Sequence, residues 1–529
     1  MTRLESTTPD TPAASLAADQ AVAIPIGFDN GHFATGHLMD DIRGRSVRGG
    51  AVTLASQAVK FILQFGSTMV LARLLSPGDF GLIAMVTAVT GFVEIFKDAG
   101  LSVATIQREH VNHDQVSTLF WINVLLSIVV MFVVIASGPA IAWFYGESRL
   151  ITITAALATA FIFSGLTVQH QALMRRQMRF KELAIVDILS MAAGIFIAIF
   201  MSLQGLGYWS LVGMTIACAA ANCVLVWLRC GWRPGAPSLR SGVADMLRFG
   251  GGLTGFSFLN YFTRNADSII IGYALGGPSL GVYSKAYGLL MMPMRQINGP
   301  IDSVILPTLS RLRFEPDRYR SAFLRAVSML SFVGIPIVAF LFVVADEIVY
   351  IILGSQWEGA AAVFRCLMPA ALLGTINVAP GWLCVSLGRT KVPLIWSAIS
   401  APISIVAFLI GAYWGIIGVA VGFSISWCGL FTLFVAMACR HSPVTFLQTA
   451  GCLLMPLVAA FFAVFISLLF VQLTADLRFS VLGSVLVNLG IFATVYFSLF
   501  AFLPSGRVRL NWLWRDGFKA LVAPKSQEI

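Results

Sequence analysis

The 529-residue chain has little charge, because Asp, Glu, Lys and Arg make up 11% of it while hydrophobic residues make up 58%. Soluble globular domains carry about 25% charged residues, so this composition excludes an ordinary soluble protein. Most apolar runs reach the ~20 residues that an α-helix needs to cross a bilayer, and the alternating pattern of barrel strands is absent. We therefore expect an all-α integral membrane protein.

Paired cysteines and catalytic motifs are also missing. The eight cysteines lie in or beside apolar runs without the spacing of metal ligands, which is typical of small buried side chains. The segment "REHVNHD" (108–114) contains metal-ligand residue types, but we interpret it as a solvated loop. No nucleophile, base and orienting group occur together. We expect no metal, no cofactor and no enzymatic activity.

Apolar runs, cut at charged or Gly- and Pro-rich breaks, predict about fourteen transmembrane helices. The first six span residues 50–74, 78–101, 116–144, 149–172, 182–203 and 208–229. The next six span residues 246–273, 279–306, 322–345, 359–387, 392–413 and 416–438, and a final pair spans 447–473 and 479–503.

Basic residues gather on one face of this arrangement. Of 35 Lys and Arg residues, 27 fall on the side of both termini, three fall on the opposite side and five fall inside spans. The positive-inside rule then predicts that both termini are cytoplasmic. The formal net charge of +10 is therefore mainly a signal of topology, and we expect no nucleic-acid partner.

The first two blocks of six helices are related by a short repeat. A shift of 200 positions aligns "LARLLSPGDFGLI" (71–83) with "IGYALGGPSLGVY" (271–283). Because six is even, both blocks have the same orientation, as in transporters built from parallel repeats. We predict two six-helix lobes around a central cleft, plus two C-terminal helices. The predicted units are a disordered cytoplasmic tail at 1–47, an N-terminal lobe at 48–230, a cytoplasmic linker at 231–245, a C-terminal lobe at 246–440, two additional helices at 441–504 and a cytoplasmic amphipathic tail at 505–529.

The segment "VLARLLSPGDFGLIAMVTAVTGFVEIFKDAGLSVATIQR" (70–108) contains L-A-R-x-L-x-P-x-D-F-G-x, followed by Gly-Leu and Gln-Arg. It resembles the opening of the Wzx-type polysaccharide-repeat-unit flippases of the MOP transporter superfamily. The resemblance implies alternating-access transport of an undecaprenyl-pyrophosphate-linked oligosaccharide from the cytoplasmic to the periplasmic leaflet. The product would be exopolysaccharide or lipopolysaccharide. It also implies a location in the bacterial cell inner membrane. The sequence leaves open whether the protein works alone or beside a polysaccharide polymerase and a chain-length regulator.

The five basic residues inside spans are the main candidates for function. Each costs about 2.5–3.5 kcal/mol on insertion scales, so each should face protein or a wet cavity. Lys60 and Gln64 share one face of the first helix, as Asn260 and Arg264 do on the seventh. We expect the first, second, seventh and eighth helices to line the cleft. The predicted substrate-binding residues are Lys60, Gln64, Asn260, Arg264, Lys285 and Arg295.

Cations at membrane depth have a physical purpose if the substrate carries a pyrophosphate, because they replace its water with charge-assisted hydrogen bonds. Two acids, Glu94 and Asp267, are candidates for exchange of a proton or Na⁺ during the conformational change. The alternative for Asp267 is simple pairing with Arg264. The remaining cation, Arg365, has a candidate partner in Glu358.

Two competing functions remain open. A small-solute or multidrug antiporter of the same superfamily would carry a cavity richer in carboxylates. A membrane polysaccharide polymerase or ligase would need a large outward loop, and the longest here is the partly apolar segment 345–359. The excess of buried bases over buried acids favours an anionic, lipid-linked substrate.

Overall fold

The computed structural model describes residues 33, 42–92, 102, 105, 106, 111–238, 244–389, 391–474 and 480–502. These residues form α-helices and one short 3-10 helix, with no strand among them. The expected all-α membrane architecture is confirmed. The described part of the chain contains eleven candidate spans that are long and apolar enough to cross a membrane.

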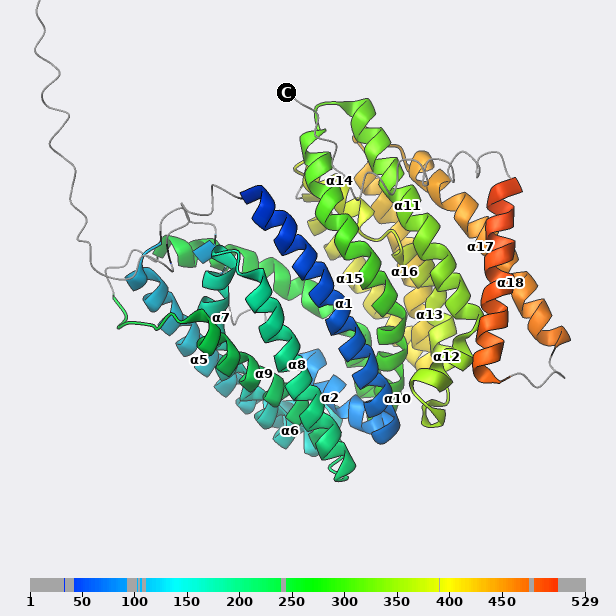
Figure 1. The fold of residues 1–529 in the computed structure, drawn as a ribbon. Helices are drawn as coiled ribbons and strands as arrows, with labels where there is room; N and C mark the ends of the chain where they lie inside the picture. Colours follow the sequence, from blue (N-terminus) through cyan, green and yellow to red (C-terminus); the bar gives the residue numbers. More distant parts are fainter. Residues whose placement is uncertain are drawn as a thin grey trace, which may run out of the picture.

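The first lobe is formed by helices from the N-terminal half of the chain (Figure 1). Helices α6 and α7 follow each other so closely that they form one candidate span, Arg149–Arg176. The bounds are α1 (Ile42–Leu74), α2 (Pro77–Thr90), α5 (His113–Tyr145), α6 (Arg149–Ala158), α7 (Ala160–Arg176), α8 (Phe180–Leu203) and α9 (Trp209–Cys230).

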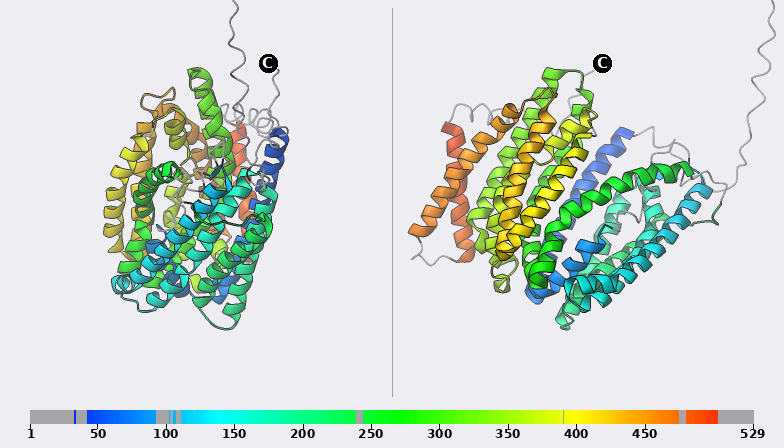
Figure 2. Two further views of the ribbon diagram at one scale, coloured as in Figure 1. Left: turned by 90° about the vertical axis from the view of Figure 1, so that its left-hand side faces the viewer. Right: turned by 180° about the vertical axis from the view of Figure 1, so that it is seen from behind.

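Helix α10 (Ala244–Arg311) joins the two lobes. Its backbone leaves the helical conformation at Gly276, where φ is +80° and ψ is 176°, and the two arms run back towards the same side (Figures 1 and 2). Glycine suits this φ because a Cβ would be strained there. The second lobe continues with α11 (Pro316–Val343), α12 (Ala345–Ile352), η2 (Ser355–Trp357), α13 (Ala360–Gly374), α14 (Ala379–Ser386), α15 (Lys391–Ala412), α16 (Gly415–Cys439), α17 (Phe446–Leu473) and α18 (Val481–Phe502).

The predicted spans agree closely with these helices, although the count of fourteen stays a prediction. The eleven candidate spans leave out α2, an apolar helix of 14 residues, and the 68-residue α10. Sequence breaks at 273–279 predict two helices where the structure has two arms meeting at Gly276. Helix α1 begins at Ile42, within the segment 1–47 predicted as a tail. The C-terminal tail at 505–529 lies outside the described residues.

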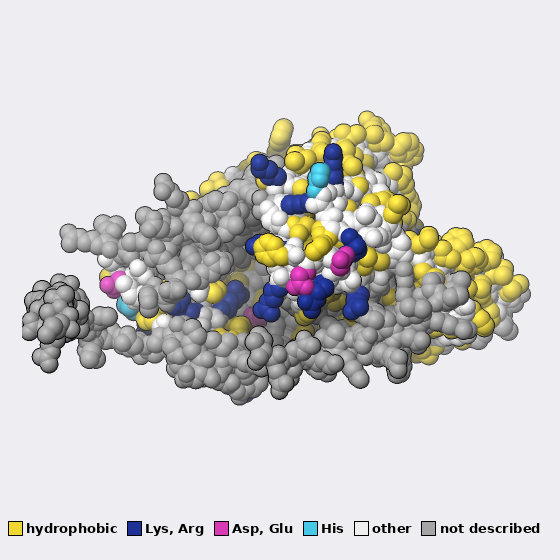
Figure 3. All heavy atoms as spheres, turned by 90° about the horizontal axis from the view of Figure 1, so that it is seen from above, with side chains coloured by type: hydrophobic (Ala, Val, Ile, Leu, Met, Phe, Trp, Pro, Cys, Tyr) yellow, Lys and Arg dark blue, Asp and Glu magenta, His cyan; other side chains and the backbone are white. Residues whose placement is uncertain are grey.

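Helix α1 begins and α18 ends on the same side of the molecule, which we name the termini face (Figure 1). The opposite side, where α1 ends at Leu74 and α10 turns at Gly276, is the remote face. Seen from the termini face, Lys and Arg side chains gather over the described part of the second lobe, beside a hollow in the surface (Figure 3). This side is the one that the basic residues predict to be cytoplasmic.

The two repeats meet at the remote face. Ser76 caps α2 by accepting a hydrogen bond from the backbone N–H of Asp79 at 3.2 Å, and the Asp79 carboxylate accepts one from the Ser76 N–H at 2.9 Å. The motif S-P-G-D is thus a capping box with proline in the first turn. A Cβ on Gly81 would lie 1.8 Å from the carbonyl oxygen of Gly277, so α2 and α10 touch through their backbones.

Candidate functional site

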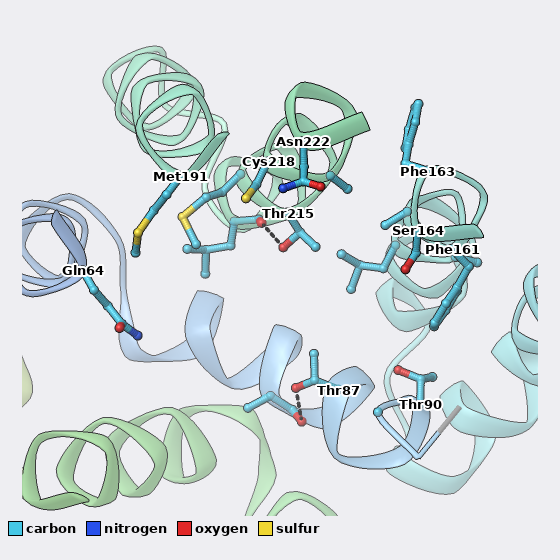
Figure 4. Close-up of a pocket in the computed structure, with 18 of the residues that line it drawn as sticks. Gln64, Thr87, Thr90, Phe161, Phe163, Ser164, Met191, Thr215, Cys218 and Asn222 are labelled. Atoms are coloured by element: carbon cyan, nitrogen blue, oxygen red, sulfur yellow. Dashed lines mark hydrogen bonds between the residues drawn. The ribbon is translucent and has the colours of Figure 1, made fainter. Parts of the chain in front are cut away.

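A cavity of about 1130 Å³ lies between the first-lobe helices and α10. Side chains of α1, α2, α7, α8 and α9 point into it (Figure 4). Both arms of α10 contribute too, through residues such as Ser268 and Ser284. No described residue of α11–α18 lines it, so its described wall consists of helices that precede α10 and of α10 itself. Its size suits a ligand larger than a simple ion.

Hydroxyl groups form much of the polar wall. Thr87 donates to the carbonyl oxygen of Ile83 at 2.9 Å, and Thr215 donates to that of Leu211 at 3.1 Å. Because each hydroxyl has one proton, a hydroxyl that donates to its own helix keeps only acceptor lone pairs for a ligand. The wall therefore favours a ligand rich in hydrogen-bond donors, such as a sugar.

Amide side chains supply both donors and acceptors. On α7 and α9, Gln171 donates to the Asn222 side-chain oxygen at 2.9 Å, and both residues line the cavity. Gln64 lines it from α1 (Figure 4). Together with the hydroxyls, these groups give the cavity the hydrogen-bonding partners that an oligosaccharide requires.

Two cations and no carboxylates appear among the described residues that line the cavity. Lys285 lies on the second arm of α10, nine residues after the turn at Gly276, or about 13 Å along the helix axis. Arg175 is exposed and lies one residue before the end of α7, at the termini face. The cations therefore stand towards opposite ends of the cavity. An anion moving from the termini face to the remote face would meet both.

Phe80 holds the Lys285 ammonium group. The Lys285 Nζ lies 3.8 Å from the centre of the Phe80 ring, a cation–π contact that contributes about 2 kcal/mol when it is desolvated. No carboxylate in the described part of the chain forms an ion pair with Lys285. A charge held by a ring remains available to an anion, whereas a charge in an ion pair is already neutralised.

The predicted substrate-binding residues fall into three groups. Gln64 and Lys285 line the cavity. Lys60 does not line it, because its Nζ lies 3.0 Å from a carboxylate oxygen of Asp187 on α8. Arg264 is exposed, is not part of the wall and makes no ion pair with the described residues. The side chains of Asn260 and Arg295 lie outside those that the structure describes, so their roles stay predictions.

Of the two acids predicted for ion coupling, the structure describes only Asp267. Glu94 lies outside the described residues. Asp267 is buried, and it accepts hydrogen bonds from the Tyr283 hydroxyl at 2.8 Å and from the Ser268 backbone N–H at 2.7 Å. Pairing of Asp267 with Arg264 is not what the structure has, because the partners of this carboxylate come from other positions on α10.

The ion-pair partner predicted for Arg365 is wrong. The sequence offers Glu358 as its partner, but the structure pairs it with Asp346 on α12. Sequence spacing along one helix favours Glu358. The chain between α12 and α13 folds back, however, and this brings a carboxylate 19 residues away into contact.

Helices α7, α8 and α9 form a part of the wall that the sequence patterns above do not predict. Helix periodicity carries the missing signal, because Ser164, Thr167, Gln171 and Arg175 recur on one face of α7. That stripe is visible in the sequence. What it faces, lipid or cavity, depends on the packing of α7 against α9.

The sequence profile of the polysaccharide biosynthesis protein family matches residues 70–362, more than half of the chain. Lipopolysaccharide biosynthesis protein WzxC from Escherichia coli is 25% identical over 389 residues, which cover 72% of this chain and 78% of that protein. Succinoglycan biosynthesis transport protein ExoT from Rhizobium meliloti is 25% identical over 317 residues, covering 60% of this chain and 64% of that one.

Among solved structures, lipid II flippase MurJ in an inward closed conformation has a TM-score of 0.68. The two chains are 13% identical, and the match covers 86% of this chain and 98% of the flippase. At that identity the likeness shows the fold alone. A transporter fold, and relatives named for polysaccharide biosynthesis and transport, agree with the expectation of a membrane protein that is not an enzyme.

Proposed function

Because the chain belongs to the polysaccharide biosynthesis protein family, we propose that it is a flippase for a lipid-linked oligosaccharide. The observation that carries this proposal is the cavity wall, where described hydroxyls, amides and two cations occur without a carboxylate. This wall matches a ligand with sugar hydroxyls and a phosphate-bearing head group. A cavity for cationic drugs would need the opposite charge.

Within this proposal, Lys285 binds the pyrophosphate at depth and Arg175 receives it at the termini face. Gln64, Gln171 and Asn222 bind the glycan. Arg264, Arg295, Asn260 and Lys60 remain proposals as further ligands in other conformations of the transporter. The polyprenyl tail stays in the bilayer, since it gains nothing from a polar wall.

The finer features follow the resemblance found in the sequence. The substrate is an undecaprenyl-pyrophosphate-linked repeat unit, and transport runs by alternating access from the cytoplasmic to the periplasmic leaflet of the inner membrane. The termini face is cytoplasmic, which is supported by its basic side chains. Glu94 and Asp267 are proposed to couple transport to a proton or Na⁺. A polysaccharide polymerase and a chain-length regulator are proposed as partners. The lobes are proposed to divide near residues 231–245.

The test is a deletion strain in which lipid-linked intermediates are assigned to each leaflet. We expect the undecaprenyl-linked repeat unit to accumulate on the cytoplasmic leaflet. Finished single units outside the membrane, with no cytoplasmic accumulation, would point to a polymerase instead.

Complementation with Lys285→Ala tests the site itself. Loss of the ammonium group should abolish export of the repeat unit at an unchanged protein level. The matched control is Lys391→Ala, since Lys391 is exposed at the first residue of α15. Full export by Lys285→Ala would refute a cationic cavity centred on this residue.

A further inference from the structure

A chain of contacts runs from the cavity to the junction between the lobes at the remote face. Phe80 lines the cavity on one side, where Lys285 contacts its ring at 3.8 Å. The same ring packs against Trp357 of η2, with ring centres 5.5 Å apart. Trp357 is fully buried and does not line the cavity. Phe80 is therefore the wall between the cavity cation and a tryptophan of the other lobe.

Trp357 ties the second lobe to the end of α1. Its indole N–H donates to the carbonyl oxygen of Ala72 at 2.8 Å. The neighbouring Gln356 also donates to Ala72, and to the carbonyl oxygen of Leu75 at 3.0 Å. Ala72 lies in the last turn of α1 and Leu75 directly follows the helix, so no intrahelical N–H is available to their carbonyl oxygens. The second lobe thus completes the C-terminal cap of a first-lobe helix.

A fourth hydrogen bond crosses the same junction in the other direction. Arg73 of α1 donates to the carbonyl oxygen of Ile351 at 2.8 Å. The segment that carries Trp357 is bounded by Gly354 and Gly359, with φ of +97° and +86°. Glycines with such φ values let the segment turn sharply at both ends.

We propose that Phe80 and Trp357 are positioning residues that couple Lys285 to closure of the cavity at the remote face. While the Lys285 ammonium rests on Phe80, the ring is held against Trp357, and Trp357 holds the end of α1. An anion that draws Lys285 away from the ring removes that support and favours opening at the remote face. The inference rests on the proposed function in that the cavity must open to two sides, but it does not depend on which glycan is carried.

The test uses Cys218, a native cysteine that lines the cavity. A membrane-impermeant maleimide is applied to right-side-out and to inverted membrane vesicles that contain the full chain, and labelling of Cys218 from each face is measured. All other cysteines are replaced by alanine, namely Cys223, Cys230, Cys366, Cys384, Cys428, Cys439 and Cys452.

Loss of the Phe80 ring in Phe80→Leu should raise labelling from the remote face by about five- to thirtyfold, the range for losing a partly desolvated cation–π contact. Phe80→Tyr keeps the ring and should label as the parent does. Trp357→Ala should match Phe80→Leu. Trp414→Ala is the control, because Trp414 is an exposed tryptophan between α15 and α16.

The variant Lys285→Gln tests whether Phe80 acts through Lys285 or whether its loss merely weakens the packing at the remote face. If the contacts act as one chain, the double variant Phe80→Leu with Lys285→Gln should label no faster than either single variant. If the double variant instead shows the product of the two single increases in labelling, Phe80 and Lys285 act independently and the proposed coupling is wrong. Unchanged remote-face labelling in Phe80→Leu and Trp357→Ala, with normal labelling from the termini face as proof of folding, would overturn the proposal entirely. The labelling assay contains no polysaccharide, so its result does not depend on the result of the deletion-strain experiment.

Discussion

Gly81 is the position where one methyl group should have the largest effect on the transport cycle. An alanine Cβ there would lie 1.8 Å from the carbonyl oxygen of Gly277. A normal C···O contact is about 3.3 Å, so α2 and α10 would have to separate by about 3.3 − 1.8 = 1.5 Å. Overpacking of this kind costs about 1–3 kcal/mol. The cost applies only to the conformation in which the two helices touch at the remote face.

Gly81→Ala should therefore shift the equilibrium towards opening at the remote face by about 5- to 150-fold, which corresponds to 1–3 kcal/mol. The measurement is the ratio of Cys218 labelling from the two faces, made in the variant that retains only this cysteine. Gly281→Ala repeats the test from the other repeat, since its Cβ would lie 1.9 Å from the carbonyl oxygen of Pro77.

The matched control is Gly288→Ala, a helical glycine of α10 with no atom within 4 Å of an added Cβ. It should gain about 1 kcal/mol of helix stability and leave the labelling ratio unchanged. A labelling ratio for Gly81→Ala equal to that of Gly288→Ala, in folded protein, would refute the reasoning. It would mean that the contact between α2 and α10 accommodates an added methyl group, or that this contact does not open during transport.

Two polar pairs give further predictions. Lys60→Ala should lower stability by about 1 kcal/mol or less, because the pair with Asp187 is partly exposed, and Lys60→Asp combined with Asp187→Lys should recover it. The thermal unfolding midpoint in detergent measures this, and a swapped protein no more stable than Lys60→Ala would contradict the pairing. Tyr283→Phe removes a donor from buried Asp267 and should cost about 1–3 kcal/mol, seen as a lower midpoint. An unchanged midpoint would mean that the hydroxyl contributes nothing to holding the carboxylate.

Local features of the sequence predict the helices well because a chain segment inside a bilayer has few backbone conformations that satisfy its hydrogen bonds. A run of about 20 apolar residues must form a helix, since no water can satisfy its backbone in hydrocarbon. Thus the predicted span at 416–438 corresponds to α16, Gly415–Cys439. The turn predicted after residue 273 corresponds to Gly276, where the arms of α10 meet.

The site was only partly predictable, because hydropathy says that a charge is costly but not which neighbour relieves the cost. Lys60, Lys285 and Arg365 look alike in the sequence. The structure gives Lys60 a carboxylate on α8, Arg365 a carboxylate on α12, and Lys285 the ring of Phe80.

Hydropathy and turn residues are enough to predict the membrane class, the positions of the helices and the repeated turn that brings glycines to the remote face. These follow from short-range rules of hydrophobicity, capping and backbone freedom. Long-range packing determines which polar helix face lines a cavity, and it gives Lys285 an aromatic ring as its neighbour in place of a carboxylate. Those outcomes depend on contacts such as Trp357 with Ala72, which join residues 285 positions apart.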